Sequence, residues 1–167
     1  MYRMGKNKEE TKPRVGGLFS GVGGIELGFQ ESGFEIAWAN EIDKHSCQTY
    51  RENFSHTLHE GDIKLLNGKD LQPVDVLCGG FPCQAFSIAG YRKGFEDDRG
   101  NIFFEIIRLV NELETMPKVL FLENVKNFKT HDKGNTFKTV LQIINDLGYS
   151  VFHDVLNTCD YTSLRIT

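Results

Sequence analysis

Hydrophobic and polar positions follow one another along this chain in two periods, one typical of strands and one of helices. Short apolar runs bounded by glycine or polar residues predict strands over Val15–Phe19, Phe34–Ala39, Val74–Cys78, Val119–Leu122 and Tyr149–Leu156. The third strand is expected to stop at Gly79-Gly80, and the fourth to be buried. Helical spacing predicts helices over Ile25–Glu31, His45–Asn53, Asn101–Leu113 and Phe137–Leu147, with Gly148 as a C-terminal cap.

This alternation of strands and helices with short connections predicts the α/β class. We expect a doubly wound, mostly parallel sheet with helices on both faces. The sequence shows no repeat and no linker between folded halves, so it predicts a disordered tail over 1–13 and one domain over 14–167. The stretch from Phe81 to Arg99 has no period, and a long loop inside a compact domain is usually functional.

Composition excludes several classes of protein. The chain has 167 residues, 40% of them hydrophobic and 25% charged, which is ordinary for one globular domain. No apolar run reaches the roughly 20 residues that a bilayer span requires. The formal net charge of −4 argues against a free-standing nucleic-acid binder, because neutralising phosphates needs a basic surface. The four cysteines have neither C-x-x-C nor zinc spacing, which predicts reduced thiols in a cytosol-like compartment and no metal.

Candidate chemistry follows the predicted strands, because parallel sheets bind ligands beyond the carboxyl ends of their strands. Gly21-x-Gly23-Gly24 follows the first strand and would let the backbone approach a ligand closely, although Glu26 replaces the third glycine of dinucleotide sites. Glu41 ends the second strand about 20 residues later, the spacing at which an acid binds ribose hydroxyls. Together they favour a nucleoside site.

Cys83 and Glu123 are the candidates for catalysis. Cys83 follows a buried strand and two glycines, where a thiolate could be a nucleophile rather than a small buried hydrophobe. Glu123 ends another strand and could act as an acid or a hydrogen-bond partner. A redox role is the weakest alternative, because Cys78 does not lie at redox-motif spacing from Cys83.

Taken in order, these segments resemble the DNA (cytosine-5)-methyltransferase family. The resemblance runs from about Val15 to Tyr161 and is most specific over Gly79–Arg108. It implies a Rossmann-like, S-adenosyl-methionine-dependent methyltransferase fold. The matching segments are Phe19–Gly24, Asn40–Asp43, Gly61–Ile63, Gly79–Gln84, Asp98–Asn101 and Glu123–Val125.

The resemblance implies a covalent mechanism. Cys83 would add to C6 of cytosine while Glu123 holds or protonates N3, and C5 would then take the methyl group of S-adenosyl-methionine. Loss of the C5 proton would release the enzyme by β-elimination. The target base lies inside the duplex and would have to be flipped out. The segment from Gln84 to Arg99, with Ser87, resembles the family's loop that closes over the DNA.

The resemblance also implies the cofactor contacts. Phe19, Gly21 and Gly23 would line the methionine and sulfonium end, and Glu41 would bind ribose. The remaining contacts would be Ile42 on adenine, Asp62 at its amino group with Ile63 beside it, and Pro82 and Ile102 at the pocket wall.

The chain departs from the family pattern at two places. Gly17 stands where the family usually has an acidic residue, which predicts either a looser first strand or the loss of one hydrogen-bonding group near the cofactor. After Tyr161 the chain has Thr162–Thr167 instead of the family's Gln-x-Arg-x-Arg segment, and the target recognition domain is not in it.

Three interpretations therefore stay open. The first is a DNA-methylating enzyme of a restriction-modification system, in which a second polypeptide could carry the recognition domain. The second is a fragment that binds S-adenosyl-methionine without independent activity. The third is an RNA cytosine-5 methyltransferase. We expect a location in the bacterial cytoplasm, or with DNA in the nucleus of a eukaryote, and no membrane partner.

Overall fold

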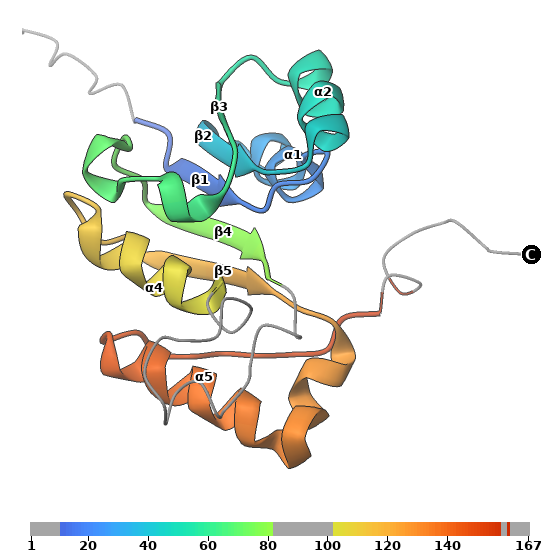
Figure 1. Cartoon of the computed structure of the whole chain (residues 1–167), viewed down its shortest axis with the longest axis vertical. Helices are drawn as coiled ribbons and strands as arrows, with labels where there is room; N and C mark the ends of the chain where they lie inside the picture. The colour runs from blue at the N-terminus through green and yellow to red at the C-terminus, as the bar shows by residue number, and fades with distance from the viewer. Residues whose placement is uncertain (1–10, 82–101, 158–159, 161–167) are drawn as a thin grey trace, which may run out of the picture. The chain divides into compact units, whose positions relative to one another are not determined.

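A five-stranded, all-parallel sheet forms the centre of the computed structural model, which describes residues 11–81, 102–157 and 160 (Figure 1). The strand order is β3-β2-β1-β4-β5. The sheet consists of β1 (Arg14–Leu18), β2 (Glu35–Glu41), β3 (Thr57–Glu60), β4 (Val76–Gly80) and β5 (Val119–Glu123). The α-helices are α1 (Gly24–Glu31), α2 (Lys44–Asn53), α4 (Ile102–Glu112) and α5 (Asn135–Asp146), and the 3-10 helices are η1 (Ile63–Leu65), η2 (Gly68–Asp70) and η4 (Lys126–Gly134).

The chain divides into two compact units, one ending at Glu123 and one beginning at Asn124. The first unit holds the whole sheet with α1, α2 and α4, and the second holds η4 and α5. In the second unit, Gly134 precedes α5 and Gly148 follows it, both with positive φ angles of 83° and 92°. The backbone N–H of Gly148 donates to the carbonyl of Asn145, which confirms the predicted cap.

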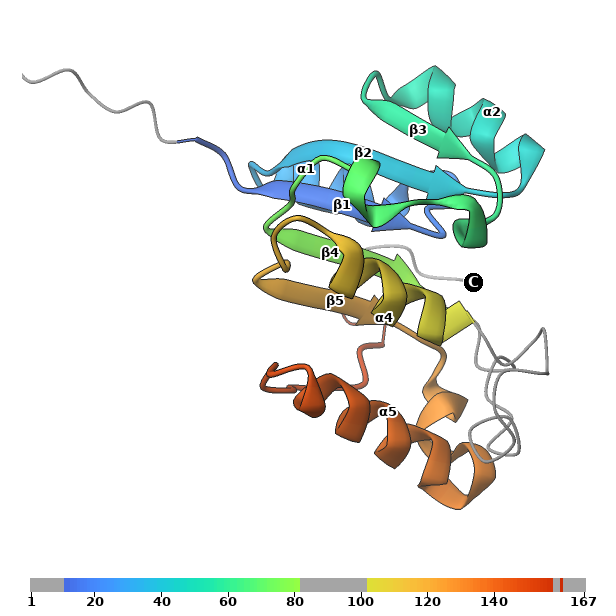
Figure 2. The same ribbon diagram turned by 60° about the vertical axis from the view of Figure 1, so that its left-hand side comes forward.

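Helices cover both faces of the sheet in the first unit, as the sequence predicts. Ile25 and Phe29 of α1 pack on a cluster formed by Val15, Ile36, Val76 and Cys78. Helix α4 lies on the opposite face, in front of β4 and β5 in both views (Figure 2). Its apolar stripe is almost fully buried at Phe103, Ile106, Leu109 and Val110. Full burial of such a side chain contributes roughly 1.5–3 kcal/mol, so packing rather than helix propensity fixes α4.

Strand β4 includes Gly79 and Gly80 and ends at Gly80, whereas the sequence predicted that it would end at Cys78. The physical reason is the close approach of β1. A Cβ atom on Gly79 would lie 2.8 Å from the carbonyl oxygen of Leu18, which leaves no room for a side chain. Glycine is therefore needed here for packing between two central strands, and not to end one of them.

Three further features differ from the sequence predictions. Strand β3 was not predicted, because Thr57–Glu60 has little apolar character. Strand β5 is the outermost strand of the described sheet, so Val119 and Phe121 are about half exposed (49% and 47%) instead of buried. The range 149–156 is not a strand: within the described residues it pairs with no neighbour, and Phe152 is 93% exposed.

The described residues contain neither a helix suited to a membrane nor a cluster of metal ligands. No described helix combines the length and the apolar character that crossing a membrane would require. Nor do three His, Cys, Asp or Glu side chains come together anywhere in the described parts of the chain as a metal site would need.

Candidate functional site

The predicted site residues collect along one edge of the sheet, where the carboxyl ends of the strands lie side by side. Leu18 pairs with both Asn40 and Gly79, Glu41 pairs with Glu60, and Gly80 pairs with Glu123. The segments that follow these strands therefore emerge together. The predicted residues placed at this edge are Phe19, Gly21, Gly23, Glu41, Ile42, Asp62, Ile63 and Glu123.

The loop after β1 has an unusual backbone. Phe19, Gly21 and Gly23 all have positive φ angles, of 54°, 55° and 93°. A Cβ on Gly23 would lie 2.8 Å from Cζ of Phe54 and 3.0 Å from Cε2 of Tyr50, so this glycine is packed against aromatic rings. A Cβ on Gly21 would meet no atom within 4 Å, so the backbone is open on that side. The loop thus offers a backbone surface that a ligand can approach.

Glu41 joins this loop to the end of β2. Its Oε2 accepts a hydrogen bond from the backbone N–H of Gly21 at 2.7 Å, and its Oε1 accepts from the N–H groups of Ile42 and Asp43 at 2.8 Å each. A carboxylate has about four acceptor positions, so one position on Oε2 remains for a ligand hydroxyl. The side chain is only 8% exposed, which strengthens any hydrogen bond made there.

Asn40 ties the ends of β2 and β3 together, a role that sequence reasoning missed. Its buried Nδ2 donates to the carbonyls of His59 (2.8 Å) and Gly61 (3.0 Å). The backbone N–H of Gly61 also donates to the carbonyl of Glu41 at 2.8 Å. The position of Asp62 relative to Glu41 is therefore set by three hydrogen bonds. A polar residue inside an otherwise apolar strand pattern was the available signal.

Asp62, Ile63 and Ile42 form the far end of the site. Asp62 caps η1, because its Oδ1 accepts from the backbone N–H of Lys64 at 2.9 Å. Ile63 is buried, so it supports the turn from below. Ile42 is 63% exposed at the end of β2, an apolar surface of the kind on which a flat ring could pack.

Glu26 was not predicted as a site residue, yet it is the most buried acid at this edge. It is 1% exposed, and its Oε2 finds no hydrogen-bond partner among the described residues. Its Oε1 lies against Gly17, in the space where a side chain at that position would begin. Burial raises the pKa of Glu26, and the charge of Glu41 raises it further. The nearby Ser20 hydroxyl is also buried, and its proximity to the Glu26 carboxyl partly offsets the rise in the pKa of that group.

The catalytic candidates are placed only in part. Glu123 is exposed at the end of β5, and its Oε2 lies beside Gly80, where a Cβ would be 2.9 Å away. Phe81 and Ile102 are the described residues that border 82–101 on either side. The ring centroids of Phe81 and Phe103 lie 5.5 Å apart. Pro82, Cys83, Gln84, Ser87 and Arg99 lie outside the described residues, so their predicted roles stay predictions.

The two cysteines that the structure describes are poor candidates for thiolate chemistry. Cys47 and Cys78 are free and each only 1% exposed. Burial raises the pKa of both thiols, and the charges of Glu41 and Glu26, respectively, raise them further. A nucleophilic cysteine needs a lowered pKa and access to substrate. Thiol chemistry in this chain therefore has to be sought at another cysteine.

Comparison with known proteins gives a consistent result. A family model described as C-5 cytosine-specific DNA methylase matches residues 14–163. Type II methyltransferase M.Bsp6I from Bacillus sp. is 48% identical over 153 residues, which cover 90% of this chain and 48% of the relative. Type II methyltransferase M.HhaI from Haemophilus parahaemolyticus is 49% identical over 156 residues, covering 93% of this chain and 47% of the relative. The chain spans about half the length of these relatives.

Solved structures with the same fold are also known. A prophage-encoded protein from E. coli, described as a DNA modification methyltransferase, superposes with a TM-score of 0.63 at 33% identity, covering 81% of this chain and 38% of that protein. The Dnmt2 methyltransferase of S. pombe superposes with a TM-score of 0.58 at 20% identity, covering 79% of this chain and 40% of that protein. The second likeness supports the fold alone.

Proposed function

The chain belongs to the family of C-5 cytosine-specific DNA methylases, and from this we propose that it carries the cofactor-binding and catalytic residues of an enzyme that methylates cytosine C5 in DNA. The observation that supports the proposal most strongly is the joining of three strand ends. Glu41 accepts from Gly21 in the loop after β1, and its carbonyl accepts from Gly61 after β3. The named relatives are bacterial type II methyltransferases, which favours a role in a restriction-modification system.

The residues at this edge fit S-adenosyl-methionine, which would supply an electrophilic methyl group. Glu41 keeps one free acceptor position on Oε2 for a ribose hydroxyl. The exposed Ile42 offers an apolar surface for adenine, and Asp62 offers an acceptor for its amino group. The open backbone at Gly21 would receive the methionine end together with Phe19 and Gly23. Ile63, Pro82 and Ile102 would complete the pocket.

The proposed reaction uses Cys83 and Glu123. The Cys83 thiolate forms a bond to C6 of cytosine, and the ring electrons move toward C5 as Glu123 hydrogen-bonds or protonates N3. C5 would then take the methyl group of S-adenosyl-methionine, whose sulfur would keep the electron pair of the broken bond as a neutral thioether. A base removes the C5 proton, the C5–C6 double bond re-forms, and the bond between sulfur and C6 breaks to return the thiolate. The exposed position of Glu123 beside the last glycine of β4 is compatible with contact to a base.

The proposed substrate is double-stranded DNA from which the target cytosine is flipped out, since its C6 cannot be reached inside the stacked duplex. Gln84, Ser87 and Arg99 would contact the DNA around that base. The formal net charge of −4 means that the phosphate-binding surface has to come from a local patch or from another polypeptide segment.

Two measurements test the proposal separately. Calorimetry of the purified chain with S-adenosyl-methionine tests the cofactor site, and Glu41→Ala should weaken binding. A duplex that carries 5-fluorocytosine, incubated with S-adenosyl-methionine, tests the nucleophile, because after methyl transfer C5 has no proton to lose and the adduct persists. We expect a covalent adduct with Cys83 present, made by the chain alone or mixed with the remaining part of a relative.

Cys83→Ser should abolish the adduct, whereas Cys47→Ser, which alters a buried thiol, should not. The catalytic assignment would be contradicted if the unmodified chain formed no adduct, either alone or mixed with the remaining part of a relative. Absence of heat on adding S-adenosyl-methionine would contradict the cofactor assignment.

A further inference from the structure

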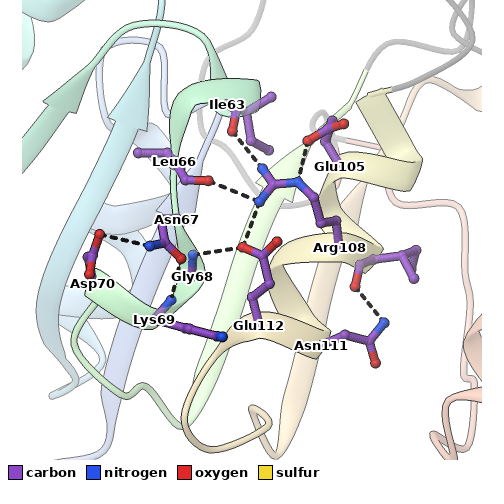
Figure 3. A network of polar contacts seen from close by, with 11 residues as sticks. Ile63, Leu66, Asn67, Gly68, Lys69, Asp70, Glu105, Arg108, Asn111 and Glu112 are labelled. Carbon is purple, nitrogen blue, oxygen red and sulfur yellow. Dashed lines mark hydrogen bonds and ion pairs between the residues drawn. The ribbon is translucent and has the colours of Figure 1, made fainter.

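One arginine connects helix α4 to the turn that carries Asp62 and Ile63 (Figure 3). The Nη2 atom of Arg108 donates to the carbonyl of Ile63 at 3.0 Å, and its Nη1 donates to the carbonyl of Leu66 at 2.9 Å. Both acceptors are backbone atoms, one in the first residue of η1 and the other in the residue that follows its last. The guanidinium therefore fixes the path of the main chain through the turn, independently of the side chains there.

Two acids hold the guanidinium in place. Its Nε donates to Glu105 and its Nη1 to Glu112, both at 2.7 Å, one turn before and one turn after it on α4. The three side chains are 13–30% exposed, so the ion pairs are shielded from most of the solvent. Charge-assisted hydrogen bonds of this length are roughly twice as strong as neutral ones. The two acids therefore fix the orientation of the Arg108 guanidinium plane, from which the N–H groups donate to the turn.

Glu112 adds a second attachment of α4 to the same segment. Its Oε2 also accepts from the backbone N–H of Gly68 at 2.9 Å, and a Cβ on Gly68 would lie 2.6 Å from Cβ of Glu112. The hydrogen bond from Gly68 and the guanidinium of Arg108 lower the pKa of Glu112, so it stays charged at neutral pH. Helix α4 is therefore attached to residues 63–68 at three points.

We propose that Arg108 is a positioning residue for the adenine end of the cofactor. The proposal rests on the function proposed above, in which Asp62 and Ile63 contact adenine. The side chain of Asp62 is oriented by the hydrogen bond with which it caps η1. This hydrogen bond requires the main chain of the turn to keep its path. Arg108 holds the turn closed by its bond to the Ile63 carbonyl. Recognition of the adenine amino group by Asp62 then depends on a side chain that does not touch the ligand.

The alternative is that Arg108 only stabilises the fold. The two roles separate in a measurement of ligand discrimination. S-adenosyl-homocysteine carries the adenine amino group, whereas S-inosyl-homocysteine has a carbonyl in its place. A loss of stability alone weakens both ligands by the same factor, if at all. A misplaced Asp62 weakens the adenosyl ligand more and so lowers the ratio of the two affinities.

The test is calorimetry of the full chain with both ligands. We expect Arg108→Gln to weaken S-adenosyl-homocysteine by about tenfold and to reduce the adenosyl-to-inosyl ratio, because two charge-assisted bonds to the turn are lost. Arg108→Lys keeps the charge but cannot reach both carbonyls with one planar fork, so it should reduce the ratio less. If Arg108→Gln does not fold, Arg108→Lys decides.

Arg14→Gln is the matched control. Arg14 also donates to a backbone carbonyl, that of Pro73 at 3.1 Å, and it forms an ion pair with Glu35, but it lies at the opposite end of β1. Arg14→Gln should leave the ratio of adenosyl to inosyl affinity unchanged, even if it lowers the stability of the protein. An unchanged ratio in the Arg108 variants would overturn the positioning role alone, whereas failure of the unmodified chain to bind either ligand would overturn the proposed cofactor site with it.

Discussion

The carboxylate of Glu26 occupies the space that a side chain at Gly17 would need. A Cβ on Gly17 would also lie 2.8 Å from the hydroxyl of Ser20. The contact between strand β1 and helix α1 at this point is therefore made by the Glu26 side chain packing against Gly17. The family resemblance implies an acidic residue at position 17, and the carboxylate of Glu26 from α1 lies against the glycine found there.

Gly17→Ala should destabilise the protein because the new methyl group collides with Glu26. Overpacking of this kind costs about 1–3 kcal/mol in the free energy of unfolding. The cost should fall sharply in a Glu26→Ala background and persist in a Glu26→Gln background, since glutamine keeps the shape of the glutamate. Urea denaturation of the six proteins, with and without Gly17→Ala in the unmodified, Glu26→Ala and Glu26→Gln backgrounds, measures it. Strictly additive effects of Gly17→Ala and Glu26→Ala would contradict the shared space.

Glu26→Gln should change how stability depends on pH. Burial raises the pKa of Glu26 above its ordinary 4.5, so the folded state keeps a proton that the unfolded state has already released. The contribution of Glu26 to stability is therefore complete below its unfolded pKa and is lost as the pH rises through the folded pKa. The glutamine variant should gain stability relative to the unmodified protein as the pH rises above the ordinary glutamate value of 4.5 toward neutrality.

Urea midpoints across that range give the difference. Glu31→Gln, which alters an exposed glutamate on the same helix, is the matched control for the loss of a glutamate. A constant difference between Glu26→Gln and the unmodified protein would show that Glu26 is not held in a dry environment.

The two left-handed glycines of the loop after β1 should respond differently to alanine. Either alanine variant should lose about 1–2 kcal/mol of unfolding free energy, because an L-residue is then placed at a positive φ. Gly23→Ala should cost more, because its methyl group would enter the rings of Phe54 and Tyr50, while Gly21→Ala meets open space. Conversely, Gly21→Ala should weaken S-adenosyl-methionine with little extra loss of stability. Equal unfolding free energies for the two variants would contradict this difference.

Cys47 and Cys78 should resist alkylation in the native protein. Both thiols are buried and burial raises their pKa values, so few thiolates are present and none is accessible. A Cys83→Ser/Cys159→Ser variant treated with iodoacetamide near pH 8 should stay unlabelled by mass spectrometry. The same variant should take two labels in guanidinium chloride. Rapid labelling without denaturant would show that the core opens around β4 or α2.

The strongly periodic parts of the fold could be predicted from the sequence. Helix α4 was predicted because its stripe repeats at 3.6 residues, and the parallel sheet followed from the alternation of strands and helices. Strand β3 was missed because it is held by the Asn40 side chain and by pairing with β2, neither of which shows as local hydrophobicity. The strand predicted over 149–156 failed for the converse reason, since apolar residues do not make a strand without a partner.

That the described candidate residues lie at one edge of the sheet could be predicted, but the hydrogen bonds among them could not. That Glu41 and Gly21 lie together follows from sheet topology, and the structure adds their direct hydrogen bond. Glu26 and Arg108 act through residues far from them in sequence, and a linear pattern carries no signal of that kind. For Arg108 a partial signal existed in Glu105 and Glu112, which place two acids on its own helix face.

The strand order also determines when each half of the sheet can form as the chain is made. Val15 of β1 pairs with Ile36 on one side and with Val76 on the other. A growing chain can complete the β1–β2–β3 half from consecutive segments, while the other side of β1 has to wait until β4 has been synthesised. During that interval, β1 presents an unpaired edge that other chains could bind. Slow elongation between Glu60 and Val76 would therefore prolong the period of greatest exposure to aggregation.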